Sequence, residues 1–256
     1  MIGLGTLVNV AAIIIGGAAG LILKRFLSTR ITDTITNAIG FAVIMVGVGG
    51  TLSNSFTVTD GYISTQFTLL MIISLAVGSL VGELINIEAK LDSFAKMCEK
   101  KFAPKDSSST FAQGFITASL IFCVGAMAIV GAIEDGINQN ADILFAKSAL
   151  DFVIAMVLAS VLGVGVLFSA AAILVYQGSI TILATFIAPY MSSELITQMS
   201  LVGSVLIIAI GFNLLKITNV RLGNMLPAIF VPVVYYLIRI FLFSMQFEYF
   251  RLLLEC

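Results

Sequence analysis

Two ionisable residues, Asp151 and Arg239, lie well inside long apolar stretches of this 256-residue chain. Because a charge at the centre of a bilayer costs at least about 2.5–3.5 kcal/mol on insertion scales, such residues mark functional or protected positions. Counted at about 1.5 Å per residue from the helix ends predicted below, both side chains lie roughly 10–12 Å beneath the outer boundary. They are therefore candidates for an ion pair, with Asp151 handling a cation or proton and Arg239 acting as countercharge or gate. The alternative to this ion pair is that Asp151 pairs with Lys147, one turn earlier on the same helix, while the Arg239 side chain extends outward to water.

Neutral amides and adjacent carboxylates add further candidates for ion binding. Asn9, Gln177 and Asn213 each lie in an apolar stretch, and amide oxygens suit a desolvated Na⁺ or K⁺. Single interhelical hydrogen bonds, worth about 0.6 kcal/mol each on average, explain these amides equally well. Glu134 and Asp135 are adjacent near the end of another apolar stretch. Two carboxylates there would concentrate cations at an outer mouth, although ordinary loop charges have the same pattern.

The residue types exclude most catalytic chemistry. The chain has no His, which removes His-based zinc, haem and acid–base sites, and it has no glycine-rich phosphate-binding loop. Its cysteines, Cys98, Cys123 and Cys256, are widely spaced and imply neither a disulfide framework nor a metal site. A net charge of −1 without a basic stripe argues against nucleic-acid binding. We therefore expect no enzyme and no cofactor, and any transport must draw on an ion or proton gradient.

The elements that position these residues are membrane-spanning helices. The chain is 59% hydrophobic and only 11% charged, with a mean hydropathy of +1.11, whereas soluble domains are roughly 45–50% apolar and 25% charged. Since a span needs about 20 apolar residues, the sequence predicts an all-α polytopic helix bundle in a single domain, 1–256. The eight predicted helices lie near 2–23, 34–52, 64–86, 111–133, 144–167, 169–188, 195–216 and 226–247. The stretch 144–188 must turn once, because one helix of that length would overshoot a bilayer of about 30 Å.

The charges of the loops orient this bundle. Ten of the thirteen Lys and Arg residues lie in the loops after the first, third and seventh helices, whereas the loops after the second, fourth and sixth carry only acidic charges. Since basic loops are cytoplasmic, both termini are predicted to lie outside. The linker 86–110 is predicted to be cytoplasmic, with an amphipathic helix followed by a flexible joint. It serves either as a solvated connector or as a docking segment for a regulator or partner.

Glycine-rich segments recur along the chain and indicate an internal repeat. Small residues close the first, third and fifth helices, as in Gly16-Gly17-Ala18-Ala19-Gly20. We infer tandem two-helix units near 1–60, 61–138 and 142–218, with the sixth helix inserted into the third unit and 226–247 appended. Small residues let helix backbones approach closely, within one chain or in a homo-oligomer. Repeated helices can instead surround a central transport site.

Five segments together carry a family resemblance: Gly3 to Leu52, Cys123 to Gly136, Lys147 to Asp151, the Tyr176-Gln177-Gly178 step, and Arg221 to Ala228. They resemble the bacterial YqgA/YdfK family of membrane proteins of unknown function, over nearly the whole chain. The resemblance implies a bacterial inner membrane. The family is described no further than as a suggested sodium channel or pump, and it has no motif with an assigned role.

These observations favour a gradient-driven transporter or channel for a small cation, Na⁺ or H⁺ foremost, embedded in the lipid bilayer of the bacterial inner membrane. The candidate site comprises Asp151, Arg239, Gln177, Asn9 and Asn213, with Glu134 and Asp135 as its outer mouth. A membrane scaffold or sensor that acts through partners is the alternative, and a carrier of small organic solutes is the third. A water-filled path to Asp151 would favour transport, and a dry, fully paired Asp151 would favour the scaffold.

Overall fold

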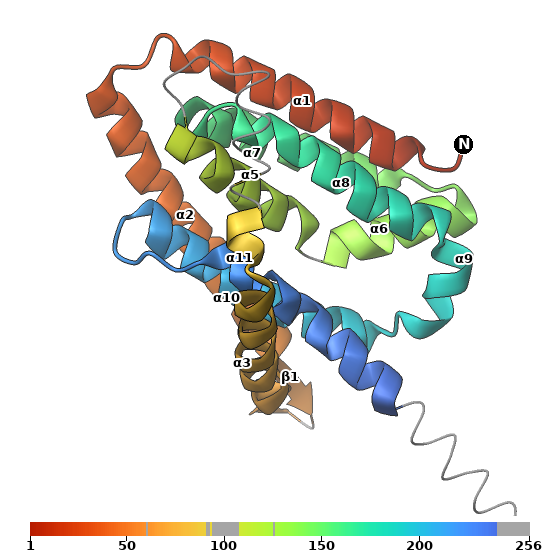
Figure 1. Ribbon diagram of the computed structural model, residues 1–256. Helices are drawn as coiled ribbons and strands as arrows, with labels where there is room; N and C mark the ends of the chain where they lie inside the picture. Colours follow the sequence, from red (N-terminus) through yellow and green to blue (C-terminus); the bar gives the residue numbers. More distant parts are fainter. Residues whose placement is uncertain (60, 91–92, 94–107, 125, 240–256) are drawn as a thin grey trace, which may run out of the picture.

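The computed structural model describes residues 1–59, 61–90, 93, 108–124 and 126–239, and nearly all of them are helical (Figure 1). The predicted all-α polytopic bundle is confirmed. Among the described residues, seven helical segments are long and apolar enough to cross a membrane, and a bent helix pair supplies an eighth. Most of the linker 86–110, the end of the last predicted helix, Cys98 and Cys256 lie outside the described residues.

The observed helices follow the predicted spans closely. The first three are α1 (Leu4–Lys24), α2 (Thr29–Ser55) and α3 (Thr68–Ile85), and the strands β1 (Phe56–Thr59) and β2 (Tyr62–Thr65) form an antiparallel hairpin between α2 and α3. Later spans are α7 (Asp142–Leu162), α8 (Gly165–Ile182) and α10 (Ser193–Leu214), with α9 (Ala184–Ile187) and η1 (Ala188–Tyr190) between α8 and α10. The last span begins with α11 (Leu222–Met225) and η2 (Leu226–Phe230) and continues as helix through residue 239.

Two helix breaks depart from the predicted boundaries. The fourth span is not one helix, because α5 (Ser108–Cys123) and α6 (Ala126–Asn138) are bent by 62° relative to each other. The predicted turn within 144–188 exists, but it occurs at Gly163, a few residues before the predicted boundary between the helices 144–167 and 169–188. Gly163 has φ 80° and ψ −155°, a conformation that only glycine adopts without strain.

Small residues decide which helices pair. A Cβ atom on Gly16 would lie 2.3 Å from the Phe152 carbonyl oxygen, and one on Gly20 would lie 2.2 Å from that of Met156, so the backbones of α1 and α7 touch. The pairs α2 with α10, α5 with α8, and α3 with the start of the last span are built in the same way. In lipid, this close packing replaces the hydrophobic driving force for helix association. The two-helix units inferred from the sequence remain a prediction.

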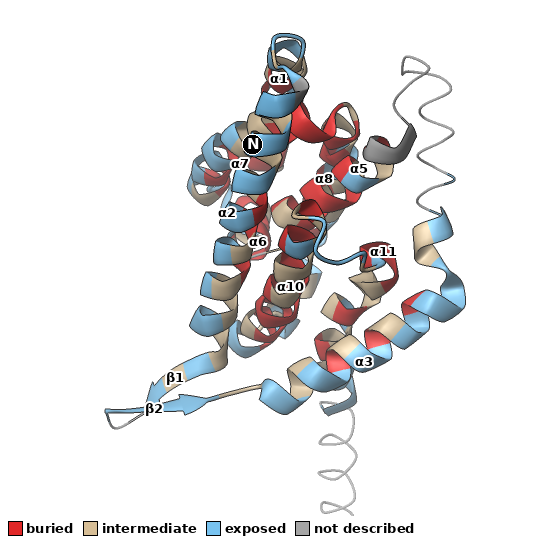
Figure 2. Cartoon of the chain, turned by 90° about the vertical axis from the view of Figure 1, so that its left-hand side faces the viewer, coloured by how far each residue is buried: buried red, intermediate tan, exposed pale blue. Residues whose placement is uncertain are grey.

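The helix α10 lies at the centre of the bundle (Figure 2). Of its apolar membrane-spanning stretch 72% is buried, against 17% for the corresponding stretch of α3. The main hydrophobic core gathers buried residues from α1, α5, α7, α8 and α10. On α3, large apolar residues such as Leu69 and Leu84 are exposed. An apolar exposed face on a helix of this length is what lipid contact requires.

Candidate ion site between α1, α7 and α8

Asp151 is paired with Lys147. The Lys147 Nζ atom lies 2.6 Å from Oδ2 of Asp151, one turn away on α7, and both residues are buried. The expected pair between Asp151 and Arg239 is wrong. Arg239 is exposed, and its Nη1 atom lies 3.6 Å from Oε1 of Glu194 at the start of α10. The Arg239 side chain reaches the first turn of α10, whereas Asp151 lies in the third turn of α7, because the last span packs against α3 and α10.

Two of the predicted amide ligands do converge on this pair. The Asn9 side-chain amide of α1 donates a hydrogen bond to Oε1 of Gln177 on α8, at 3.2 Å, and both residues are fully buried. Asn9 lies between Gly5 and Gly16 of α1, which touch Leu144 and Phe152 of α7, so it lies at the level of the pair. Within the described part of the chain, the Asn9 Oδ1 and Gln177 Nε2 atoms have no hydrogen-bond partner. Buried polar atoms rarely stay unsatisfied, so these two mark a place where a further polar group or ion would be stabilised.

The polar contacts continue toward the end of the bundle where α1 begins. Thr6 and Thr181 face each other with their hydroxyl oxygens 3.2 Å apart, and Oδ2 of Asp135 accepts a hydrogen bond from the backbone N–H of Gly5 at 3.1 Å. Together with Asn9 and Gln177 these side chains form a buried row between α1, α6 and α8, which we call the polar row: Thr6, Asn9, Asp135, Gln177 and Thr181. The polar row leads from the end of the bundle to the Lys147–Asp151 pair.

Sequence reasoning missed Thr6 and Thr181. Thr6 precedes Asn9 by three residues, and Thr181 follows Gln177 by four, so each threonine shares a helix face with an amide already singled out. That spacing was the available signal. Threonine is common in membrane helices as a packing residue, and only the contact between the two hydroxyls distinguishes this pair.

The expected acidic mouth is not formed by two equivalent carboxylates. Asp135 is fully buried and interacts with the first turn of α1, where a negative charge is stabilised by the helix dipole. Glu134 is only half-buried and accepts a hydrogen bond from Asn138 at 2.8 Å. Consecutive helical residues point about 100° apart, so adjacent acids on α6 face different surroundings.

Asn213 lies at the opposite end of the bundle and does not join the site. Its Nδ2 atom donates to the Val220 carbonyl at 2.8 Å, and its Oδ1 atom accepts from the Thr218 hydroxyl at 2.8 Å and the Val220 N–H at 3.0 Å. Asn213 belongs to the last turn of α10, so its polar atoms organise the loop that follows. Asn213, predicted as a candidate ligand of the same site, is therefore not part of it.

The bend between α5 and α6 lies beside the ion pair. The Lys147 ammonium is 6.0 Å from the centre of the Phe122 ring, at the C-terminal end of α5. A helix C-terminus carries a partial negative charge, and an aromatic face attracts a cation. Both effects favour a cation where the Lys147 ammonium lies.

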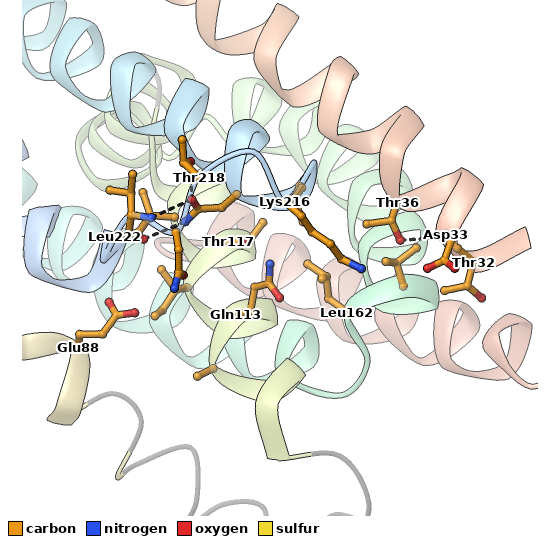
Figure 3. Close-up of a pocket in the computed structure, with 17 residues that line it drawn as sticks. Thr32, Asp33, Thr36, Glu88, Gln113, Thr117, Leu162, Lys216, Thr218 and Leu222 are labelled. Carbon is orange, nitrogen blue, oxygen red and sulfur yellow. Dashed lines mark hydrogen bonds between the residues drawn. The ribbon is translucent and has the colours of Figure 1, made fainter. Parts of the chain in front are cut away.

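An apolar layer separates the site from the other end of the bundle. Below Asn9 and Asp151 the adjoining turns contribute Ile13, Leu158 and Ile173, which are all essentially inaccessible. Beyond this layer lies a partly open cavity of about 630 Å³, whose wall includes Leu162 of α7 (Figure 3). Eleven residues separate Asp151 from Leu162, about 16 Å along the helix. The site is thus closed on that side.

The comparisons with known proteins agree with this architecture. A family model described as "Protein of unknown function (DUF554)" matches residues 4–237. The "Uncharacterized membrane protein YdfK" of Bacillus subtilis (strain 168) is 31% identical over 228 residues, covering 89% of this chain and 93% of the relative. The "Uncharacterized protein YqgA" of Escherichia coli (strain K12) is 27% identical over 229 residues, covering 88% and 93%. No solved structure matches. The chain belongs to the DUF554 family of membrane proteins.

Proposed function

We propose that the protein exchanges a small monovalent cation, Na⁺ foremost, for a proton across the bacterial inner membrane, with the Lys147–Asp151 pair as the exchange site. The observation that carries this proposal is the convergence of a buried ion pair with the unpartnered Oδ1 atom of the buried Asn9. Buried charges and unsatisfied polar atoms in a membrane interior are kept at a free-energy cost. A site that must bind and release an ion explains that cost.

Charge balance defines the exchange step. With Lys147 protonated and Asp151 ionised, the pair is neutral. A second cation in the same low-dielectric site would leave an uncompensated positive charge, which is strongly unfavourable. The incoming ion therefore binds the Asp151 carboxylate as the Lys147 ammonium loses one proton to water. When the ion leaves, Lys147 takes a proton back and the ion pair re-forms.

The polar row supplies the access route. From Gly5, whose N–H binds Asp135, to Asn9 is about 6 Å along α1, so a cation crosses only one helical turn between the buried carboxylate and the amides. Unpartnered oxygens lie at both ends of this distance, Oδ1 of Asp135 and Oδ1 of Asn9. Oxygen atoms at successive levels replace the water shell of a desolvated cation. In the proposed orientation, with both termini outside, this route lies on the outer side of the site, and its buried residues must become accessible there during transport.

A scaffold or sensor function is the second candidate, and one observation favours it. The Lys147–Asp151 pair is closed at 2.6 Å, and an apolar layer blocks the path toward the opposite cavity. A static, dry ion pair serves packing specificity as well as transport. Transport requires that this layer open during a cycle, whereas a scaffold keeps it shut.

Reconstitution into liposomes that enclose a pH-sensitive dye separates the two. Addition of Na⁺ outside is expected to move protons out of the lumen, whereas choline is not, and more Na⁺ is needed at lower pH because protons and Na⁺ compete for the exchange site. Asp151→Asn and Lys147→Met abolish the proton movement. Glu134→Gln, on a half-buried residue outside the polar row, keeps the parent rate. If no cation moves protons through the parent protein, the exchange proposal fails and the scaffold function takes its place.

A further inference from the structure

The cavity at the other end of the bundle is far larger than an ion requires. The cavity has a volume of about 630 Å³ and lies between the first turns of α2, the start of α5 and the loop after α10. Pockets for small organic molecules span roughly 300–1,000 Å³. The polar row and the ion pair do not line it, so it is a separate feature of the molecule.

Three charged residues line this cavity: Lys216 and the carboxylates Asp33 and Glu88. Glu88 accepts a hydrogen bond from the backbone N–H of Gly223, whereas Asp33 and Lys216 are exposed to the solvent that fills the open side of the cavity. Asp33 of α2 and Lys216 after α10 both belong to its wall, and in Figure 3 the Lys216 side chain extends across the cavity toward the side on which Asp33 and Thr36 lie. Among the residues that the structure describes, neither charge forms an ion pair. A ligand with one negative and one positive group would satisfy both charges.

The backbone holds Lys216 in position. Lys216 has φ 57°, a left-handed backbone conformation that favours glycine over residues with a Cβ atom. The following N–H, of Ile217, bonds back to the Phe212 carbonyl at 3.0 Å, and the three hydrogen bonds of Asn213 fix the loop as far as Val220. The rigid loop therefore fixes where the Lys216 side chain leaves the backbone, at the wall of the cavity.

The rest of the wall sets the size and polarity of a ligand. Ile116, Leu162 and Leu222 form an aliphatic side, and Thr36 and Thr117 add hydroxyl groups. An aliphatic wall near two separated opposite charges matches a molecule that carries a carboxylate, an ammonium group and a short apolar tail.

We infer that this cavity binds a small zwitterionic solute with an aliphatic tail, of the class of neutral α-amino acids, with its carboxylate at Lys216 and its ammonium group at Asp33. The inference does not depend on cation exchange at Lys147–Asp151. In the orientation proposed above, the site faces the cytoplasm.

Calorimetric titration of the full-length protein in detergent tests the site with L-leucine and two analogues that each lack one charge. These are 3-methylbutylamine, without the carboxylate, and 4-methylpentanoate, without the ammonium group. L-leucine is expected to bind, and each analogue to bind about tenfold or more weakly, the size expected for losing one hydrogen bond to a charged group. Absence of L-leucine binding, or equal binding of all three compounds, overturns the inference.

Two variants assign the charges. Lys216→Gly keeps the left-handed turn and is expected to fold at least as well as the parent, yet it should reduce L-leucine binding to the level of 3-methylbutylamine. Asp33→Asn should reduce it to the level of 4-methylpentanoate. Unchanged L-leucine affinity in both variants would contradict the assignment. Both variants should retain the parent's cation-driven proton movement, so failure of this site and failure of the proposed exchange are distinguishable.

Discussion

At the scale of single residues, the central fact is that Asp151 is neutralised by Lys147 on its own helix. Pairs at i and i+4 form wherever both side chains lie on one helix face, and here burial makes the pair strong and costly to break. Replacing one partner leaves an unpaired buried charge, whereas replacing both leaves none. The exposed Arg239–Glu194 contact at 3.6 Å contributes little, because water and salt screen it.

A double-mutant cycle measures this difference. Asp151→Asn and Lys147→Met should each lower the free energy of unfolding by about 3–5 kcal/mol, and the double variant should lose clearly less than their sum. Arg239→Gln should change it by no more than about 1 kcal/mol. Denaturant unfolding in detergent provides the measurement. Additive losses for the first two variants would mean that the pair is not formed in solution.

Two adjacent acids offer a matched comparison at the same scale. Asp135→Ala removes the buried acceptor at the first turn of α1 and should destabilise the protein by about 1–2 kcal/mol. Glu134→Ala removes a half-buried carboxylate with one local partner and should stay within about 0.5 kcal/mol. Thermal unfolding of the two variants side by side checks the prediction. Equal effects would contradict the assignment of Asp135 as the interior partner of α1.

At the scale of elements, glycine contacts determine how the helices pair. On α3, a Cβ atom at Gly82 would fall within 1.9 Å of the Asn224 carbonyl oxygen, and one at Gly78 would lie 2.2 Å from Ala228 Cα. Glu83 lies at the same contact, where it accepts a hydrogen bond from the buried Asn224 side-chain amide and forms an exposed ion pair with Arg221 at 2.7 Å. These bonds attach the end of α3 to the start of the last span.

Single alanine substitutions distinguish contact glycines from free ones. Gly20→Ala and Gly82→Ala force backbones apart and should cost about 1–3 kcal/mol of stability. Gly49→Ala and Gly178→Ala meet nothing within 4 Å and should be neutral or stabilising by up to about 1 kcal/mol, through helix propensity. Melting temperatures of the four purified variants give the comparison. If Gly49→Ala destabilised the protein as much as Gly82→Ala, the assignment of the helix–helix contacts to these glycines would be wrong.

At the scale of the whole molecule, the charges of the loops predict that both termini lie outside. Single cysteines at Ser55, Asn138 and Ser192, in a background without native cysteines, should react with an impermeant maleimide added to intact cells. Cysteines at Thr29, Ser108 and Asn219 should react only after the membrane is opened. Labelling of Ser108→Cys from outside would reverse the proposed orientation, and with it the side of the membrane on which the polar row lies.

The amino-acid sequence by itself determined the class of the molecule and the extent of its spans. Apolar length and the positions of breaks and charges belong to each segment separately, so they could be read without knowing any neighbour. For the same reason Asp151, Asn9 and Gln177 stood out as polar residues in apolar segments.

Only the tertiary structure decided which residues meet. Asp151 and Arg239 have the same predicted depth, yet Asp151 pairs with Lys147 and Arg239 with Glu194, whereas Asn9 and Gln177 are 168 positions apart in sequence and form a hydrogen bond. Depth follows from counting residues along one helix, but contact depends on the rotation and partner of every helix. Those are selected by the close backbone approaches that small residues allow, and many pairings are compatible with the same small-residue spacing until the whole bundle is packed.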